Sequence, residues 1–314
     1  MTGLVISNLG SRYEVLPDGG AAPVLCAAKG NLRIKGIRTT NPVAVGDRVV
    51  FSDAPGAEIA YITAIEPRRN YIIRRASNLS KESHILAANI DCAILVASLV
   101  HPETSTTFID RFLATAEAYD IPAVLVINKT DLLADAEGRE LLDAVAYLYR
   151  SIGYQVVLTS VRTGSGLDAL GELLAGKTSL LSGNSGVGKS SLINALIPGA
   201  NATTAAVSDA TDSGTHTTTS SRMYDLPGGG RLIDVPGVRG FGTLDFDRYE
   251  VGHFFPEIFR ESANCRFSTC THTEGEPGCA VLRAVADSRI ARSRYASYLS
   301  ILTNDATQTN QKYR

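Results

Sequence analysis

Residues 178–196 read TSLLSGNSGVGKSSLINAL, and this stretch decides the fold. An apolar run, TSLLSG, leads into GNSGVGKS at 183–190, and a helical run, KSSLINALI, follows. The central eight residues match G-x-x-x-x-G-K-[ST], in which glycines let backbone N–H groups turn toward phosphate oxygens. A strand before the pattern and a helix after it are the required context, and the helix N-terminus favours bound anions. The stretch therefore predicts a phosphate-binding loop rather than a chance glycine-rich turn.

The residues of this loop are candidate nucleotide contacts. Lys189 is expected to reach the β- and γ-phosphates, and the Ser190 hydroxyl is expected to ligate Mg²⁺. The full candidate set is Gly183, Asn184, Ser185, Gly186, Val187, Gly188, Lys189, Ser190 and Ser191.

A second motif selects the base. NKTD at 128–131 follows the apolar run PAVLVIN, at the carboxyl end of a predicted strand, where open α/β sheets bind ligands. Asp131 is expected to accept hydrogen bonds from N1–H and the exocyclic amine of guanine, two donors that adenine does not offer together. Asn128 is expected to brace the loop, and the Lys129 stem is expected to lie over the base. NKTD alone is also compatible with a helix cap at Thr130 or Asp131, but the phosphate-binding loop makes that the weaker interpretation.

Shorter signals complete the predicted nucleotide site. Thr159 and Ser160 end the next strand, where their backbone is expected to meet the guanine O6. In DVPG at 234–237, Asp234 is expected to hold Mg²⁺ through water, and the Gly237 N–H is expected to sense the γ-phosphate.

The segment 198–220 is small, polar and aperiodic, and it ends in THTTT at 215–219. Thr217 or Thr218 is expected to complete the Mg²⁺ shell, with Thr218 the preferred ligand, in a segment that orders with GTP and relaxes after hydrolysis. A threonine-rich linker is the alternative interpretation.

Strands and helices alternate from about residue 85 onward, which predicts a doubly wound α/β domain. DCAILVASL at 91–99 is continuously apolar, as expected for a parallel strand buried on both faces. Helices are expected over about 107–120, 138–152, 165–175 and 189–197, and strands over 122–128, 155–160, 178–183, 222–226 and 231–235.

Residues 1–70 read as all-β. Short runs rich in β-formers (LVISNL, RYEVL, PVLCAA, NLRIKGI, DRVVF and AYITAI) are separated by turn signals, which predicts a small barrel. The predicted division is therefore an OB-like barrel over 1–72, a P-loop domain over 73–244, and a small C-terminal domain with an amphipathic helix at about 280–302 over 245–314.

The order of the motifs is unusual. NKTD precedes the phosphate-binding loop here, whereas in most GTPases the loop comes first; a circular permutation preserves the sheet and the site while relocating the termini. With this order, NKTD, GNSGVGKSSLINAL, THTTT, DVPGVRGFG, the FFPE run at 254–257 and a Cys/His cluster resemble the RsgA family, also called YjeQ or YloQ. The resemblance covers nearly the whole chain. It implies a circularly permuted GTPase that binds the small ribosomal subunit and its rRNA, assists late maturation and converts GTP to GDP with stimulation by the ribosome.

The hydrolytic group is not the usual one. Val238 follows DVPG, where many GTPases place a glutamine that orients water. His216 is the candidate catalytic residue, because an imidazole can orient or deprotonate a water and because the resemblance implies this role at that motif position. The alternative is a histidine that merely faces solvent.

Three thiols and one imidazole crowd together near the C-terminus. Cys265, Cys270, His272 and Cys279 form the donor set of a closed structural Zn²⁺ site, with no open position for catalysis. The family pattern spaces the last cysteine one residue closer, so Cys279 is the ligand least well defined by the pattern. A chance cluster of reduced cysteines is the alternative.

The bulk composition is that of an ordinary globular protein. The 314 residues carry a net charge of −2, which does not indicate a general nucleic-acid binder. Local basic groups remain candidates for rRNA phosphates or for a solvated surface: Lys29, Arg33, Lys35 and Arg38; Arg68, Arg69, Arg74 and Arg75; and Arg289, Arg292 and Arg294 with Tyr295 on a partly basic C-terminal helix. No signal peptide or membrane span is expected, so the protein is expected to be soluble and cytoplasmic. It is also expected to be a monomer in solution.

Two further functions stay open. One is an rRNA-binding assembly factor whose GTP state only sets affinity; the other is a GTPase serving a different ribonucleoprotein or a metallochaperone. GTP turnover measured with and without small subunits separates an assembly factor from a ribosome-activated enzyme. A pull-down of rRNA tests the GTPase that serves another partner.

Overall fold

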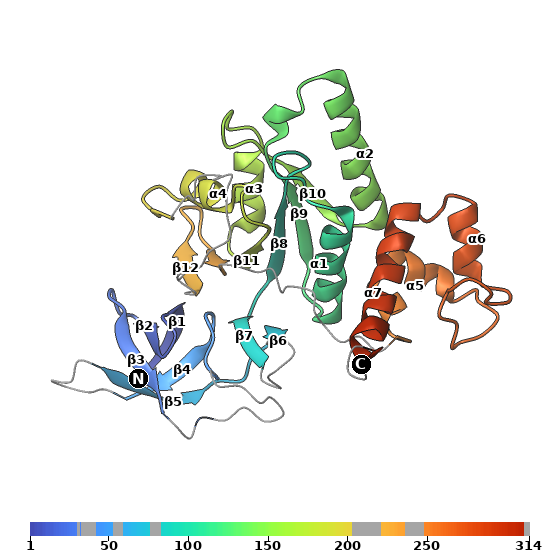
Figure 1. Ribbon diagram of the computed structural model, residues 1–314. Helices are drawn as coiled ribbons and strands as arrows, with labels where there is room; N and C mark the ends of the chain where they lie inside the picture. The colour runs from blue at the N-terminus through green and yellow to red at the C-terminus, as the bar shows by residue number, and fades with distance from the viewer. Residues whose placement is uncertain are drawn as a thin grey trace.

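The computed structural model describes residues 1–29, 32, 42–52, 59–75, 83–202, 221–235 and 248–310 (Figure 1). Four residues of the predicted nucleotide site lie outside the described residues: His216, Thr217, Thr218 and Gly237. Most of the expected strand NLRIKGI also lies outside them, as do Arg33, Lys35 and Arg38.

The N-terminal region is a five-stranded barrel. Its strands are β1 (Thr2–Asn8), β2 (Arg12–Pro17), β3 (Val24–Ala28), β4 (Arg48–Phe51) and β5 (Ala60–Ile65). They pair in the order β1-β2-β3-β5-β4, and β4 returns to β1, so the sheet closes. Among the strand pairings that the structure describes in the barrel, only that of β3 with β5 is parallel. Alternate side chains such as Val5, Tyr13 and Val15 fill the interior, which confirms the barrel predicted from the short strands.

The nucleotide-binding domain is built on a twisted, mostly parallel sheet. Its strands are β8 (Cys92–Ala97), β9 (Ala123–Ile127), β10 (Gln155–Leu158), β11 (Thr178–Ser182), β12 (Ser221–Asp225) and β13 (Arg231–Asp234). The spatial order is β10-β9-β8-β11-β13-β12, with β12 antiparallel to its neighbour. Every residue of β8 is buried, as its unbroken apolar run predicts. The predicted α/β architecture is therefore confirmed.

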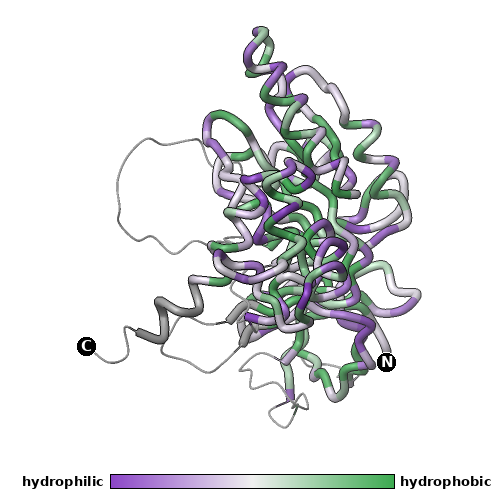
Figure 2. The backbone as a smooth tube through the Cα atoms, turned by 90° about the vertical axis from the view of Figure 1, so that its right-hand side faces the viewer, coloured by the Kyte–Doolittle hydropathy of each residue, from purple (hydrophilic) through white to green (hydrophobic). Residues whose placement is uncertain are grey.

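Helices cover both faces of this sheet. On one face α1 (Thr106–Ala118) packs on β8 and β9 and α2 (Ala136–Ile152) packs on β10, and both share a core cluster with Ala93, Leu95 and Ala97 of β8. On the other face α3 (Leu167–Leu174) and α4 (Lys189–Leu196) pack over Ile94 and Val96 of the same strand. Figure 2 shows the resulting hydrophobic interior as green chain at the centre of the molecule.

Two connections between the barrel and the nucleotide-binding domain were not apparent from the sequence. A hairpin of β6 (Tyr71–Arg75) and β7 (Ser83–Ala88) lies between them and spans the boundary expected at residue 72. Barrel strand β1 also pairs with β12, Ser7 opposite Arg222 and Asn8 opposite Ser221. The barrel and the nucleotide-binding domain thus share one eleven-stranded sheet (Figure 1).

The C-terminal region is helical: η2 (Val251–Phe254), α5 (Pro256–Ser262), α6 (Ala280–Ala286) and α7 (Arg292–Asn310). The single helix expected at 280–302 is wrong, because α6 ends at Ala286 and α7 starts at Arg292. Ser288 takes a left-handed conformation, with φ of 59°, which a continuing helix cannot accommodate. Helix α7 packs along α1 of the nucleotide-binding domain (Figure 1).

A buried ion-pair network joins these two helices. Arg294 of α7 is 1% exposed and lies 2.8 Å from Asp110 of α1 and 2.6 Å from Glu257 of α5. Tyr149 of α2 donates a hydrogen bond to the same Asp110 carboxylate. The expectation that Arg294 belongs to a basic surface is therefore wrong: its guanidinium compensates two carboxylates in the interior.

Among the described helices, none has both the length and the apolar character needed to cross a membrane.

Candidate active site and metal centre

Glycines shape the phosphate-binding loop between β11 and α4. Gly183 has φ of 149° and Gly188 has φ of 99°, values that L side chains rarely adopt. Space is also short: a Cβ on Gly183 would lie 2.3 Å from the Val96 carbonyl oxygen, and one on Gly188 would lie 2.4 Å from Nδ2 of Asn128. The loop therefore turns tightly into the N-terminus of α4, where backbone N–H groups are free of intrahelical partners.

Lys189 and Asp234 form the charged centre of this loop. The Lys189 ammonium donates to the carbonyl oxygens of Gly183 at 2.5 Å and Asn184 at 2.8 Å. Burial lowers the pKa of Lys189, an effect that Asp234 opposes. Burial likewise raises the pKa of Asp234, opposed by Lys189. Both groups are thus partly desolvated and close enough to influence each other's charge, Lys189 after β11 and Asp234 at the end of β13.

One carboxylate oxygen at this position is left without a protein partner. Oδ1 of Asp234 is buried and accepts no hydrogen bond from the described residues. Such an orphaned oxygen calls for a cation or a water. Together with the Ser190 hydroxyl at the start of α4, it fits the oxygen donors that Mg²⁺ prefers.

Asn128 connects NKTD to the phosphate-binding loop through a bond that spans 59 residues of sequence. Its Nδ2 donates to the Val187 carbonyl oxygen of the phosphate-binding loop at 2.9 Å. Its Oδ1 accepts from Thr159 Oγ1 at 3.1 Å, and its side chain is buried. One amide therefore links the loop after β9, the loop after β10 and the phosphate-binding loop.

The remaining residues of NKTD form a short turn. Lys129 is left-handed, with φ of 62°, and its ammonium donates to the His101 carbonyl oxygen at 2.5 Å. Thr130 opens the single turn η1 (Thr130–Leu132), and its Oγ1 donates to the Thr159 carbonyl oxygen at 3.1 Å. The turn is thereby fixed against the end of β10.

Asp131 lies in this turn with both carboxylate oxygens engaged. Oδ1 accepts from Ser160 Oγ at 2.5 Å, and Oδ2 lies 2.9 Å from Nε of Arg162. The Asp131 side chain is 9% exposed, whereas that of Arg162 is 72% exposed. Arg162 was missed by the sequence reasoning, although its position two residues after Ser160 in VRTG was a signal that pointed to it.

The four metal-ligand candidates come together in the C-terminal region. Their ligand atoms all lie within 4.8 Å of one another. Nδ1 of His272 lies 3.7 Å from Cys265 Sγ and 3.6 Å from Cys279 Sγ, and the two sulfurs are 3.9 Å apart. Bonds of 2.3 Å to a tetrahedral zinc imply sulfur–sulfur edges of about 3.8 Å. The donor set and its spacing therefore fit Zn²⁺.

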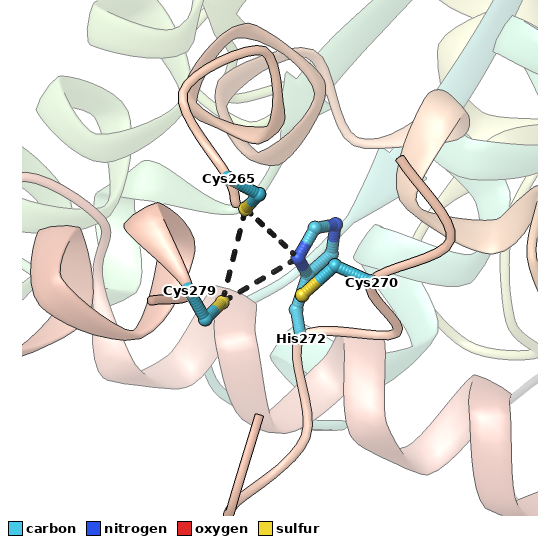
Figure 3. Close-up of side chains that lie close together, drawn as sticks. All are labelled: Cys265, Cys270, His272 and Cys279. Atoms are coloured by element: carbon cyan, nitrogen blue, oxygen red, sulfur yellow. Dashed lines mark hydrogen bonds between the residues drawn. The ribbon is translucent and has the colours of Figure 1, made fainter. Parts of the chain in front are cut away.

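Figure 3 shows how the chain supplies these four side chains. Cys270 and His272 come from one loop, and Cys265 lies opposite, after α5. Cys279 precedes α6 as its N-cap residue. His272 is left-handed, with φ of 53°, which turns its ring toward the three sulfurs. The longer spacing before Cys279 is taken up in the loop and does not remove this residue from the cluster.

The basic clusters predicted from the sequence separate into different environments. Lys29, at the end of β3, is exposed. Arg68 is not part of an open basic face: its side chain is 8% exposed and binds the buried carboxylate of Asp47 at 2.6 Å. It also donates to the Pro42 carbonyl oxygen. Arg68 therefore holds the barrel together instead of contributing to a charged surface.

Comparison with known proteins agrees with this architecture. The profile of the RsgA GTPase family matches residues 65–244. A protein of Porphyromonas gingivalis named small ribosomal subunit biogenesis GTPase RsgA is 57% identical, over 97% of each chain. A protein of Bacteroides fragilis with the same name is 54% identical, over 100% of this chain and 99% of the other.

Solved structures show the same fold along the whole chain. YjeQ of Thermotoga maritima superposes with a TM-score of 0.76 at 33% identity, covering 96% of this chain and 97% of that protein. YloQ, described as a circularly permuted GTPase, superposes with a TM-score of 0.72 at 30% identity, covering 98% and 95%. With the motif order and the joined loops already described, these similarities establish that the chain belongs to the RsgA family of circularly permuted GTPases.

Proposed function

We propose that this protein binds the small ribosomal subunit, assists its late maturation and hydrolyses GTP to GDP and phosphate under stimulation by the ribosome. The single observation that carries the nucleotide site is the 2.9 Å hydrogen bond from Asn128 to the Val187 carbonyl oxygen. It holds a base-reading motif beside a phosphate-binding loop, although NKTD comes first in the chain. The proposed partner, the small ribosomal subunit, follows from the names of the relatives.

The described residues divide the work of binding GTP. The backbone N–H groups of 183–191 receive the phosphates at the N-terminus of α4. Lys189 exchanges its carbonyl contacts for β- and γ-phosphate oxygens, which are stronger acceptors because they are charged. Asp131 accepts from guanine, Lys129 lies along the base, and the backbone at Thr159 and Ser160 meets O6. Thr130 and Asn128 hold this arrangement in place.

Hydrolysis needs a water aligned with the γ-phosphorus. That water attacks phosphorus while the bond to the bridging oxygen breaks, GDP leaves with the electron pair on that oxygen, and the water oxygen and its protons remain with the inorganic phosphate and the solvent. Ser190, Asp234 and Thr218 are the proposed Mg²⁺ partners, and the cation would neutralise charge on the phosphates when bound. His216 is the proposed group that orients the water, and Thr217 and Gly237 complete the proposed γ-phosphate contacts.

The C-terminal cluster is the proposed site of one structural Zn²⁺. The three thiolates and the imidazole would supply all four ligands of a structural zinc and leave no position for a substrate. The metal's proposed contribution is stability for a region with a small core of its own. For the whole protein we propose a cytoplasmic monomer that contacts rRNA, with the barrel and its Lys29 as one contact surface.

GTP turnover titrated with purified small subunits tests this function. The expected result is slow turnover alone and a rise with added subunits; a rate that stays flat would favour an assembly factor whose GTP state only sets affinity.

Lys189→Ala should abolish hydrolysis, and undiminished turnover would overturn the phosphate site. His216→Ala should slow hydrolysis while GDP affinity is kept, and full activity would show that His216 does not act on the water.

A further inference from the structure

The carboxylate that is proposed to read guanine already has a charged partner. Oδ2 of Asp131 lies 2.9 Å from Nε of Arg162, and Oδ1 accepts the Ser160 hydroxyl at 2.5 Å. Guanine presents two donors, N1–H and its amine, and binds best when both oxygens of the carboxylate face it. The base therefore meets an acceptor whose two oxygens are both in use.

These two contacts differ in how the chain holds them. Ser160 is fixed: its N–H and carbonyl oxygen bond within the loop to Ser165 and Gly164, and its hydroxyl also accepts from the Thr163 N–H. Arg162 contacts Asp131 through its side chain alone, and 72% of that side chain is exposed. The Ser160 contact belongs to the rigid loop, whereas the Arg162 contact reaches in from solvent and can be withdrawn.

The exposed side of Asp131 is the side from which a base would have to reach it. The interior side of the carboxylate is occupied by Ser160, and the turn carrying Asp131 is held to β10 through Thr130. Only 9% of the Asp131 side chain is exposed, and the largely exposed Arg162 side chain contacts its Oδ2. An incoming guanine and the arginine consequently compete for one carboxylate oxygen.

We propose that Arg162 is a competing partner of Asp131, which holds the carboxylate in the empty site, is displaced by guanine, and returns when GDP leaves. The inference rests on the proposed guanine-reading role of Asp131. Its functional consequence is weaker GDP binding and easier nucleotide exchange than the site would have without this arginine. Because Arg162 is largely exposed, the competition is modest, about two- to fivefold in affinity.

The test measures GDP affinity by calorimetry in the full-length protein. Arg162→Ala should bind GDP about two- to fivefold more tightly than the wild type, and the difference should shrink as salt rises, because salt screens an exposed ion pair. Arg162→Lys keeps a charge near Asp131 and should stay close to the wild type. Equal or weaker GDP binding by Arg162→Ala would overturn the proposal.

A matched control removes a similar charge elsewhere. Arg231 forms an exposed ion pair with Asp225 at the opposite end of β13 from Asp234. Arg231→Ala should leave GDP affinity unchanged, since it alters net charge equally but does not touch the base site. If it tightens GDP binding as much as Arg162→Ala does, general electrostatics accounts for the effect and the proposal fails.

Asp131→Asn separates this inference from the function on which it rests. The variant should prefer xanthosine diphosphate to GDP, and in that background Arg162→Ala should leave xanthosine diphosphate affinity unchanged. An unaltered preference for GDP would remove the base-reading role itself. A switched preference without tighter GDP binding by Arg162→Ala would remove the Arg162 proposal alone.

Discussion

Replacing Arg294 by methionine tests whether the C-terminal region is held to the nucleotide-binding domain by charge. The Arg294 guanidinium makes three charge-assisted hydrogen bonds, to both oxygens of Glu257 and to Asp110. Arg294 and Asp110 are at most 1% exposed, and Glu257 is 8% exposed. Arg294→Met removes the cation and leaves two buried carboxylates uncompensated, so the free energy of unfolding should fall by about 3–5 kcal/mol.

The same change should make stability depend on pH in a defined direction. Burial raises the pKa of Asp110, and Arg294 opposes that rise. Without Arg294, the pKa of Asp110 in the folded protein rises further above its value in the unfolded chain. The folded state therefore binds a proton at Asp110 more readily than the unfolded state as pH falls. Relative to the wild type, the stability of Arg294→Met should therefore recover as pH falls, so its deficit should be smaller at acidic than at neutral pH. Adding Asp110→Asn should recover part of the loss at neutral pH.

Urea unfolding in zinc-containing buffer measures the free energy of unfolding of each variant. Far-ultraviolet circular dichroism is the probe, because the chain has no tryptophan whose fluorescence could be followed. Arg289→Met is the matched control, because Arg289 pairs with Glu261 while half exposed, and the change should alter stability little. Equal midpoints for the two variants, or a deficit at pH 5 as large as at pH 7, would refute the argument from buried charge.

Three further predictions concern the sites. Gly188→Ala should abolish GDP binding, because its Cβ would collide with the Asn128 amide 2.4 Å away and its φ of 99° is unfavourable; calorimetry showing wild-type affinity would contradict this. Asn128→Ala should cost about 1–3 kcal/mol of unfolding free energy and weaken GDP binding, because Val187 and Thr159 lose a buried partner; an unchanged urea midpoint would count against it. Elemental analysis should find one zinc per chain, and Cys279→Ser should lose it and lower the melting temperature; wild-type zinc content in the variant would exclude Cys279 as a ligand.

Most of the nucleotide-binding domain could be predicted because its signals are local. Continuous apolar runs such as β8, and the loop between β11 and α4, specify their own conformation through periodicity and glycine spacing. The Cys/His set was predictable for the same reason: its four members lie within 15 consecutive residues.

Contacts between distant residues were out of reach. Arg294 and Asp110 are 184 residues apart in sequence. An arginine on a polar helix is therefore predicted to be a surface group, and only the packing of α7 on α1 shows that it is buried. Arg68 was misread in the same way, since Asp47 lies in a different part of the barrel. The break between α6 and α7 depends on one left-handed serine, which no periodicity marks.

The ladder between β1 and β12 makes the barrel a cover for a strand edge. In the spatial order of the sheet, β12 is the last strand of the nucleotide-binding domain, and β1 pairs with the beginning of its outer edge, at Ser221 and Arg222. Unpaired edges recruit strands from other chains, and natural proteins block them. A truncated protein beginning after residue 70 would expose the backbone of Ser221 and Arg222 as well, which lengthens the unpaired edge of β12. Besides its proposed contact to RNA, the barrel therefore shields part of the GTPase sheet from pairing with strands of other chains.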